Sequence, residues 1–274
     1  AGGRYPALRS AVICLEDSVA CSSVPQALTN LARLLEIRLK AGPALFVRPR
    51  DPAMLAHVLR FDGVEQLKGF VIPKITVSNF PDYLAHLPDD RYLLMPTLET
   101  MEALDPTQAV RLRDQLIAVK ARVLVLRIGG NDLLHAVGAR RSSERTAYEG
   151  PLGPMIAALI AAFAPYGFQL SAPVFESFDR PDVLREEVRR DLEYGLCTKT
   201  AIHPAQIEVI QSCYAVDPHE LAEAHTILAA EHAVFASRGV MCEPKTHSRW
   251  AFAIIRRAAV FGVFPKSGAL VATA

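Results

Sequence analysis

Short apolar runs alternate with segments of helical periodicity along most of the chain. The apolar runs are rich in Val, Ile and Leu and show no strict polar alternation, which is typical of strands covered on both faces. They predict buried parallel strands at residues 11–15, 44–47, 69–72, 92–95, 122–128, 169–174 and 198–202.

The segments between these runs have the spacing of amphipathic helices, and several begin with Ser, Asp or Pro, which favour helix starts. They predict helices at residues 25–41, 52–61, 78–87, 106–118, 153–166 and 181–194. Strands that alternate with helices imply βαβ units and a parallel sheet. A chain of 274 residues is the right size for one α/β barrel.

The count is seven strands, whereas a closed barrel needs eight. We therefore expect a TIM (β/α)8 barrel whose first strand is missing from this chain, with a strand-sized gap beside residues 11–15. Beyond the last run, helices are predicted at 204–213, 218–237 and 248–260, with an irregular segment at 238–247. We expect residues 1–213 to form the barrel and residues 214–274 to form a C-terminal helical extension and lid of the same domain.

Composition narrows the class of protein. The formal net charge is +1, which predicts neither a nucleic-acid partner nor a membrane surface. The longest apolar stretch, residues 155–164, is too short to cross a bilayer, and we find no signal peptide at the start. Five cysteines without a Cys-x-x-Cys pair indicate reduced thiols, so we expect a cytoplasmic protein. The charge run at 185–190 is expected to be a solvated helix face.

Each of the seven apolar runs is followed by at least one ionisable side chain. In a parallel barrel, the carboxyl ends of the strands form the edge where active sites lie. A charge after every run is hard to attribute to chance, and it predicts an active site at this edge. The residues are Glu16, Asp17, Arg48, Lys74, Glu99, Asp132, Glu176 and His203.

Glu99 and Asp132 are the acids that end the fourth and fifth runs. A carboxylate at the end of a buried strand is costly unless a cation meets it, and Mg²⁺ prefers such oxygen ligands. Arg48 can hold a substrate carboxylate in a two-pronged contact. A metal with a nearby cation would stabilise an enolate developing on a 2-oxo acid. Gly129 and Gly130 would let a substrate approach the backbone closely.

Structural roles remain open for several of these residues. Glu16 and Asp17 could cap the following helix, and Arg48 could pair with either of them. Lys74 could equally be a salt-bridge partner, and His203 fits a hydrogen-bonded structural residue better than a metal ligand. No zinc-binding spacing and no nucleotide-binding glycine loop is present in the sequence.

Six segments, in order along nearly the whole chain, resemble the citrate lyase β-subunit-like group of the HpcH/HpaI aldolases. The segment Lys-x-x-Ile-His-Pro-x-Gln is the most specific of them, whereas Glu-Thr alone would be weak. The segments are Leu-Glu-Asp-Ser-Val at 15–19, Val-Arg-Pro-Arg at 47–50, Ile-Pro-Lys at 72–74, Leu-Glu-Thr at 98–100, Gly-Gly-Asn-Asp-Leu at 129–133 and Lys-Thr-Ala-Ile-His-Pro-Ala-Gln at 199–206.

The resemblance implies a TIM-barrel carbon–carbon lyase, of the oxo-acid-lyase or aldehyde-lyase type. Such an enzyme would cleave a hydroxy acid or its acyl-CoA thioester through a metal-bound enolate of a 2-oxo acid such as oxaloacetate. It also implies a homotrimer or hexamer whose C-terminal lid reaches a neighbour's active site. By similarity, Glu99 and Asp132 hold Mg²⁺, the catalytic residues are Arg48, Asp17 and the lid acid Glu243, and the substrate contacts are Arg48, Glu16, Lys74, Gly130 and Asn131.

The sequence departs from the family pattern at three places. The lid acid is Glu243 rather than Asp, and a shift of about 1 Å can cost on the order of 100-fold in rate. Val-Arg-Pro-Arg replaces Val-Arg-x-Asn, and the family's first strand is missing. Two alternatives therefore stand beside the lyase. One is a phosphoenolpyruvate- or pyruvate-utilising enzyme, because Gly-Gly-Asn-Asp-Leu also resembles the metal-binding turn of those enzymes. The other is an inactive metabolite-binding barrel.

Overall fold

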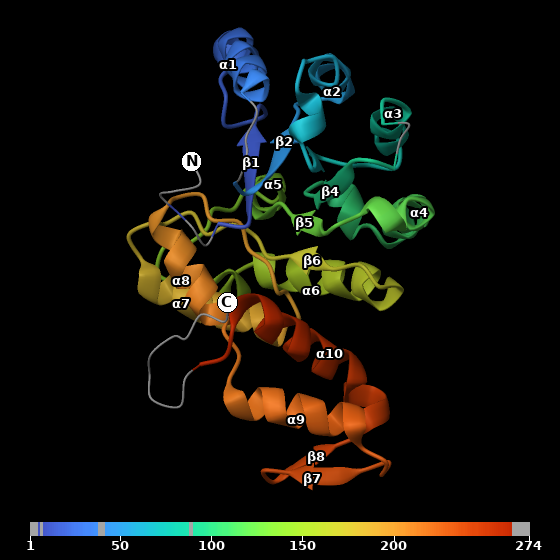
Figure 1. Cartoon of the computed structure of the whole chain (residues 1–274). Coiled ribbons are helices and arrows are strands. Elements are labelled where there is room, and N and C mark those ends of the chain that lie inside the picture. The colour runs from blue at the N-terminus through green and yellow to red at the C-terminus, as the bar shows by residue number, and fades with distance from the viewer. Residues whose placement is uncertain (1–4, 6–7, 38–41, 88–89, 265–274) are drawn as a thin grey trace.

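The structure is a computed structural model that describes residues 5, 8–37, 42–87 and 90–264. Residues 1–4 and 6–7, the end of the predicted helix at 38–41, and residues 265–274 of the predicted extension lie outside the described residues. Six strands form one curled parallel sheet in chain order (Figure 1). They are β1 (Ser10–Cys14), β2 (Ala44–Arg48), β3 (Gly69–Ile72), β4 (Leu93–Leu98), β5 (Leu126–Ile128) and β6 (Leu170–Ser171).

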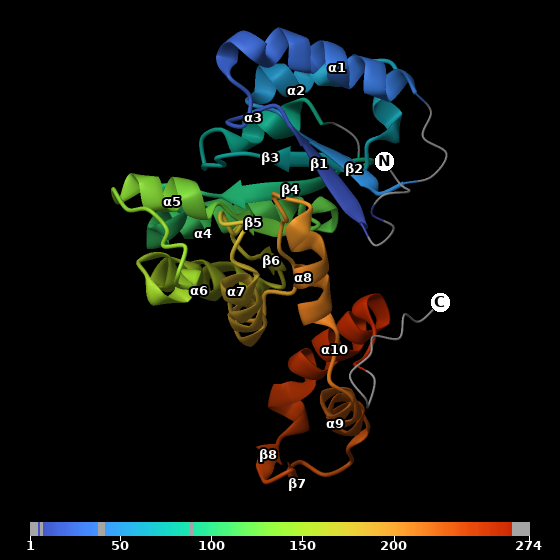
Figure 2. The same ribbon diagram turned by 90° about the vertical axis from the view of Figure 1, so that its left-hand side faces the viewer.

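Helices follow the strands and cover the convex side of the sheet (Figure 2). Local signals start several of them: the Asp51 side chain accepts from Met54 N at 2.7 Å, and Asp105 accepts from Gln108 N at 2.8 Å. No helix in the described part of the chain has the length and apolar character needed to cross a membrane. The helices of the barrel part are α1 (Val24–Glu36), α2 (Pro52–Val58), α3 (Phe80–Ala85), α4 (Pro106–Ala118), α5 (Gly130–Ala136), α6 (Leu152–Phe163), α7 (Pro181–Glu193) and α8 (Ala205–Tyr214).

The two faces of the sheet differ in what they bury. Alternate strand residues such as Ile72, Leu98 and Leu126 point outward into the main core shared with the helices. The residues between them point inward, where an apolar cluster fills the end of the sheet at which the strands begin. That cluster contains Phe46, Val71, Met95 and Val125, with Val12 and Leu93 beside it. Towards the carboxyl ends of the strands, the same inner face turns polar.

The barrel is open beside β1. In the described part of the chain β1 pairs with no strand other than β2, which confirms the expected gap. At the other edge, the predicted seventh strand contributes a single bridge, Ala172 to Lys199. The predicted run 122–128 is also shorter as a strand, because a 3₁₀ turn at Lys120–Arg122 precedes β5. The buried Arg122 side chain donates to the Leu87 carbonyl at 2.9 Å and holds that turn.

The C-terminal part contains a hairpin that the sequence did not predict. The C-terminal part consists of α9 (Pro218–Ala229), β7 (Phe235–Ser237), β8 (Val240–Cys242) and α10 (Pro244–Phe261), and β7 and β8 form the hairpin. The predicted helix 218–237 ends at Ala229, and β7 occupies the last three residues of its range. Arg238 and Gly239, at φ +48° and +78°, then turn the chain between β7 and β8. Figures 1 and 2 both place this part on the far side of the molecule from α1–α3. The division at residue 213 stays a prediction.

Candidate active site

Six charged side chains meet at the carboxyl ends of β1 to β5, as the sequence predicted. We call them the rim cluster: Glu16, Asp17, Arg48, Lys74, Glu99 and Asp132. Each comes from a strand end or from the loop that follows a strand, so the parallel sheet brings distant parts of the chain together. Glu99 and Asp132, the predicted metal ligands, both contact Lys74.

Arg48 joins two acids from different strands. Its Nη2 lies 2.8 Å from Glu16 Oε2 and 2.9 Å from Glu99 Oε1. Burial opposes the charge of Arg48, but Glu99 and Glu16 outweigh it and raise the pKa of the guanidinium. The pairing with Glu16 that the sequence left open is therefore present. Both of these contacts are made by Nη2 of Arg48. Arg48 Nε is buried and has no hydrogen-bond partner.

Lys74 is held at the site by its backbone and its side chain. Its Nζ donates to Glu16 Oε1 at 2.8 Å and to Asp17 Oδ2 at 2.6 Å, and lies 3.4 Å from Asp132 Oδ1. Its φ of +47° is rare for a residue with a side chain, and this conformation lets its N–H donate to Glu99 Oε1 at 2.7 Å. The hydrogen bond from Lys74 lowers the pKa of Asp17.

Glu99 lies directly over Gly129. A Cβ at position 129 would stand 2.2 Å from Glu99 Oε2, so the absent side chain makes room for this carboxylate. At Gly130, a Cβ would meet Leu152 at 2.9 Å and Pro173 at 3.0 Å. Both glycines are thus required by packing within the protein, and their approach to a substrate stays a prediction. Burial raises the pKa of Glu99 to about 7.

The rim cluster carries more negative than positive charge. Four carboxylates face two cations, which leaves two negative charges in surplus when all four acids are ionised. The contacts of Glu99 use Oε1 and that of Asp132 uses Oδ1, so Glu99 Oε2 and Asp132 Oδ2 take part in none of them. Among the described residues, no group of three or more His, Cys, Asp or Glu side chains is arranged as a metal site. Two carboxylates completed by water and substrate oxygens nevertheless fit Mg²⁺.

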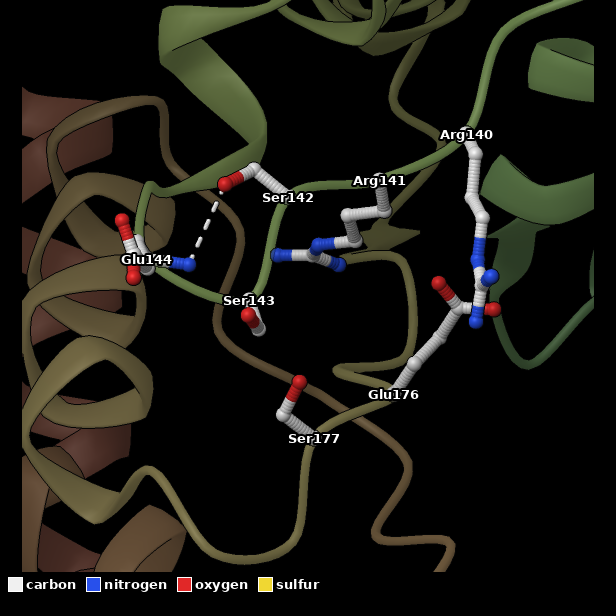
Figure 3. A pocket seen from close by; sticks show the side chains of 7 residues that line it. All are labelled: Arg140, Arg141, Ser142, Ser143, Glu144, Glu176 and Ser177. Carbon is white, nitrogen blue, oxygen red and sulfur yellow. Dashed lines mark hydrogen bonds between the residues drawn. The ribbon is translucent and has the colours of Figure 1, made fainter.

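Other predicted residues have partners outside the rim cluster. Asn131 Nδ2 donates to Glu176 Oε1 at 2.9 Å, which ties the start of α5 to the loop after β6. That loop borders an open cavity of about 500 Å³ lined by residues 140–144, 176 and 177 (Figure 3). His203 stacks on Phe178 with ring centroids 5.0 Å apart, and its Nδ1 accepts from Ala205 N, which fits the structural role that the sequence favoured.

Glu243 is not brought to the rim cluster within one chain. It stands at the start of α10, where Thr246 Oγ1 donates to Glu243 Oε2 at 3.0 Å. Its N–H donates to His247 Nδ1 at 3.0 Å. The hairpin and α10 lie away from the strand ends in both views (Figures 1 and 2). A catalytic role for Glu243 therefore requires a second copy of the chain, and it stays a prediction.

Sequence reasoning missed a second ion network, which we call the buried cluster: Lys199, Glu187, Asp191, Arg141 and Tyr148. Lys199 Nζ donates to Glu187 Oε1 at 2.8 Å and to Asp191 Oδ2 at 2.9 Å. Tyr148 OH donates to Asp191 Oδ1 at 2.6 Å, and Arg141 also pairs with Glu187. The lysine of the most specific sequence motif thus contacts the acids of α7 and lies apart from the rim.

The expectation that the charges at 185–190 form a solvated helix face was wrong for Glu187. Glu186, Arg189 and Arg190 are exposed, but Glu187 is fully buried, as is Asp191 one turn later. The signal was available, because Glu187 and Asp191 lie four residues apart on the face that also carries Val183, Leu184 and Val188. Charged side chains on an apolar stripe need buried partners.

Residues 1–263 match the family described as C–C bond lyases of the TIM-barrel fold. A (3S)-malyl-CoA thioesterase of Cereibacter sphaeroides is 31% identical over 137 residues, which is 50% of this chain and 46% of that protein. The chain spans about half the length of the curated relatives it matches.

Two solved structures share the fold. A citrate lyase from Burkholderia xenovorans has a TM-score of 0.73 at 22% identity, covering 92% of this chain and 84% of that one. The protein CitE from Mycobacterium tuberculosis, in complex with magnesium, acetoacetate and coenzyme A, has a TM-score of 0.67 at 23% identity, covering 90% and 89%. The predicted resemblance to citrate lyase β-like proteins is confirmed, and the chain belongs to the family of C–C bond lyases of the TIM-barrel fold.

Proposed function

We propose that this protein is an Mg²⁺-dependent carbon–carbon lyase that cleaves a hydroxy acid or its acyl-CoA thioester to release a 2-oxo acid. The observation that carries the proposal is the surplus of two negative charges in the rim cluster, at the carboxyl ends of parallel strands. A divalent cation would balance this surplus, and Glu99 and Asp132 would hold it. Bound there, Mg²⁺ would polarise substrate oxygens and stabilise the negative charge that develops during cleavage.

The remaining residues suit substrate binding. Arg48 Nε is a buried donor without a partner, so it can donate to a substrate carboxylate or carbonyl oxygen while Nη2 stays on the two glutamates. Asp17, with a side chain 65% exposed, can reach solvent and substrate at the mouth of the site. Glu16 and Lys74 fix the positions of these groups through their mutual contact.

Cleavage requires two proton transfers. The hydroxyl group of the substrate loses its proton as its carbon becomes a carbonyl, and the carbon–carbon bond beside it breaks. The departing fragment keeps the electron pair and takes up a proton. We assign one of these transfers to Glu243, because it stands where the resembling family has its lid acid. Since Glu243 lies away from the rim cluster in its own chain, a neighbouring copy would have to supply it. A homotrimer or hexamer would bring it there.

Relatives support the choice of substrate class. The Mycobacterium tuberculosis neighbour was solved with magnesium, acetoacetate and coenzyme A, and the curated relatives are named for malyl-CoA. Both names pair a small acid with coenzyme A. We therefore propose an acyl-CoA thioester as the first substrate to test and a free hydroxy acid as the second.

The test is a turnover screen of both substrate classes with Mg²⁺ and with EDTA, for wild type and Glu99→Gln. Loss of a charge-stabilising metal site is expected to reduce turnover by roughly 1,000-fold. Glu186→Gln, an exposed acid on α7, should keep wild-type turnover. Mg²⁺ binding without turnover would favour the metabolite-binding barrel, and turnover of phosphoenolpyruvate alone would favour that class of enzyme. Unfolding of Glu99→Gln would indicate a structural ion network.

A further inference from the structure

Arg127 is the central residue of β5, and it points towards the inside of the barrel. Its neighbours Leu126 and Ile128 both pack in the outer core, so strand alternation turns Arg127 to the inner face. It pairs in register with Thr97 on β4 and with Ser171 on β6. Glu99 and Gly129 lie two residues further along the same strands, on the same face. Arg127 therefore stands one layer below the proposed metal site.

The guanidinium of Arg127 forms no hydrogen bond and no ion pair with any residue that the structure describes. The charged side chains that influence it are Arg48, which repels it, and Glu99, which attracts it. Burial lowers the pKa of Arg127 to about 10, so the side chain remains a cation at neutral pH. A cation kept inside a barrel without a paired acid is costly, and a ligand anion would remove that cost.

Two further polar atoms on this inner face lack partners. Thr97 is 2% exposed and its Oγ1 has no hydrogen-bond partner. Arg48 Nε, whose guanidinium reaches Glu99 on β4, is likewise without one. Buried polar atoms are nearly always satisfied in native proteins, so this group of unsatisfied donors indicates a ligand. A guanidinium and a hydroxyl are donors suited to a carboxylate or a phosphate.

We propose that Arg127 binds a second anionic group of the substrate, so that the enzyme selects 2-oxo or 2-hydroxy acids that carry a further carboxylate or phosphate. The inference rests on the proposed function, because the first carboxylate is taken to lie at Glu99, Asp132 and Arg48. The second anion would then reach down the inner face to Arg127, with Thr97 donating beside it. Arg127 would thus determine specificity and leave the cleavage step to the rim cluster.

The experiment compares three stable 2-hydroxy acids by calorimetric titration at fixed ionic strength and saturating Mg²⁺. Lactate has one carboxylate, malate adds a second, and 3-phosphoglycerate adds a phosphate. Wild type should bind malate or 3-phosphoglycerate roughly 10- to 100-fold more tightly than lactate, as expected for a charge-assisted contact. The preferred acid identifies the anion. In Arg127→Met this preference should vanish while lactate binding stays, and Arg127→Lys should retain part of it.

Arg140→Met is the matched control. Arg140 is an exposed arginine beside the cavity of Figure 3, and its replacement removes the same charge outside the barrel. It should leave the preference unchanged. Equal binding of all three acids by wild type, binding of none, or loss of the preference in Arg140→Met but not in Arg127→Met would overturn the inference. Failure of the proposed function looks different: an Arg127-dependent preference would persist, with no turnover of any acid or thioester.

Discussion

The rim cluster and the buried cluster are built from the same kinds of side chain, but they differ in charge balance and access to water. In the buried cluster, Lys199 and Arg141 face Glu187 and Asp191, so positive and negative charges are equal. The side chains of Lys199 and its two acids are 0% exposed. In the rim cluster four acids face two cations, and Asp132 is 30% exposed.

This is the difference that we expect between a structural network and a functional one. In the buried cluster the charges are equal, and Lys199, Glu187 and Asp191 are shut off from water, so we expect it to hold α7 against the loops around it. An unbalanced network that reaches solvent can bind a cation and a substrate. Four predictions test this contrast, from the largest expected effect to the smallest.

Lys199→Met should be the most destabilising of these changes. It leaves Glu187 and Asp191 buried with one cation fewer, and breaking such a network costs about 3–5 kcal/mol. Urea unfolding followed by circular dichroism measures the loss in the free energy of unfolding. Arg189→Met removes an exposed charge from α7, the helix that carries Glu187 and Asp191, and should change stability by less than about 0.5 kcal/mol. A loss below about 1 kcal/mol in Lys199→Met would contradict the structural role.

Glu99 should make the metal-free protein less stable as the pH rises. Its pKa is raised from an ordinary value of 4.5 to about 7, so its stabilising contribution is complete below pH 4.5 and is lost as the pH passes 7. The change amounts to at most about 3 kcal/mol. Stability curves of wild type and Glu99→Gln in EDTA should therefore lie close together at low pH, where Glu99 is protonated and resembles the amide, and wild type should fall below Glu99→Gln as the pH passes 7. Mg²⁺ at pH 8 should stabilise wild type alone. Parallel curves would show that the charge of Glu99 is balanced in the folded protein and would contradict its raised pKa.

Gly129→Ala tests the packing of Glu99 without changing any charge. The new Cβ would stand 2.2 Å from Glu99 Oε2, so the carboxylate must move. We expect a stability loss of about 1–3 kcal/mol and a fall in Mg²⁺ affinity of roughly 10- to 100-fold. Gly150→Ala is the control, because a Cβ there meets nothing within 4 Å. Calorimetric titration with Mg²⁺ measures the affinity of both variants. Equal affinities of Gly129→Ala and Gly150→Ala for Mg²⁺ would argue against Glu99 as a ligand.

Asp17→Asn should change stability least. Asp17 is mostly exposed, and its partner Lys74 keeps its contact with Glu16, so the expected loss is below about 1 kcal/mol. Its predicted catalytic role requires that turnover fall further than this loss explains. Unchanged turnover would restrict Asp17 to positioning Lys74.

The order of strands and helices was predictable because hydrophobic periodicity is local. The range predicted for one helix, residues 106–118, coincides with α4, and the strand at 69–72 coincides with β3. The hairpin β7–β8 was not predicted, because its strands are three residues each and β7 lies within the helical pattern predicted for residues 218–237. The prediction of a seventh strand at 198–202 was wrong in extent, because the segment makes only a single bridge, between Lys199 and Ala172.

The residues of the candidate site were largely visible in the sequence, since each follows an apolar run. Their pairing was not, because Arg48 lies 51 residues from Glu99 and Lys74 lies 58 from Glu16. Arg127 was missed because it falls inside a strand, where a charged residue looks like an ordinary interruption. Lys199 was seen only as part of a motif, and the structure shows that its partners are the buried acids of α7.

The sequence by itself determined the barrel class, the family and the set of ionisable residues at the strand ends, because periodicity and motif order depend on neighbouring positions alone. Tertiary structure decided which charges are balanced. Charge balance depends on distances of a few ångströms between segments far apart in the chain, and only the curled parallel sheet sets those distances. That is why Lys199 lies shut off from water against α7, whereas the rim cluster reaches solvent through Asp17 and Asp132 and has more acids than cations.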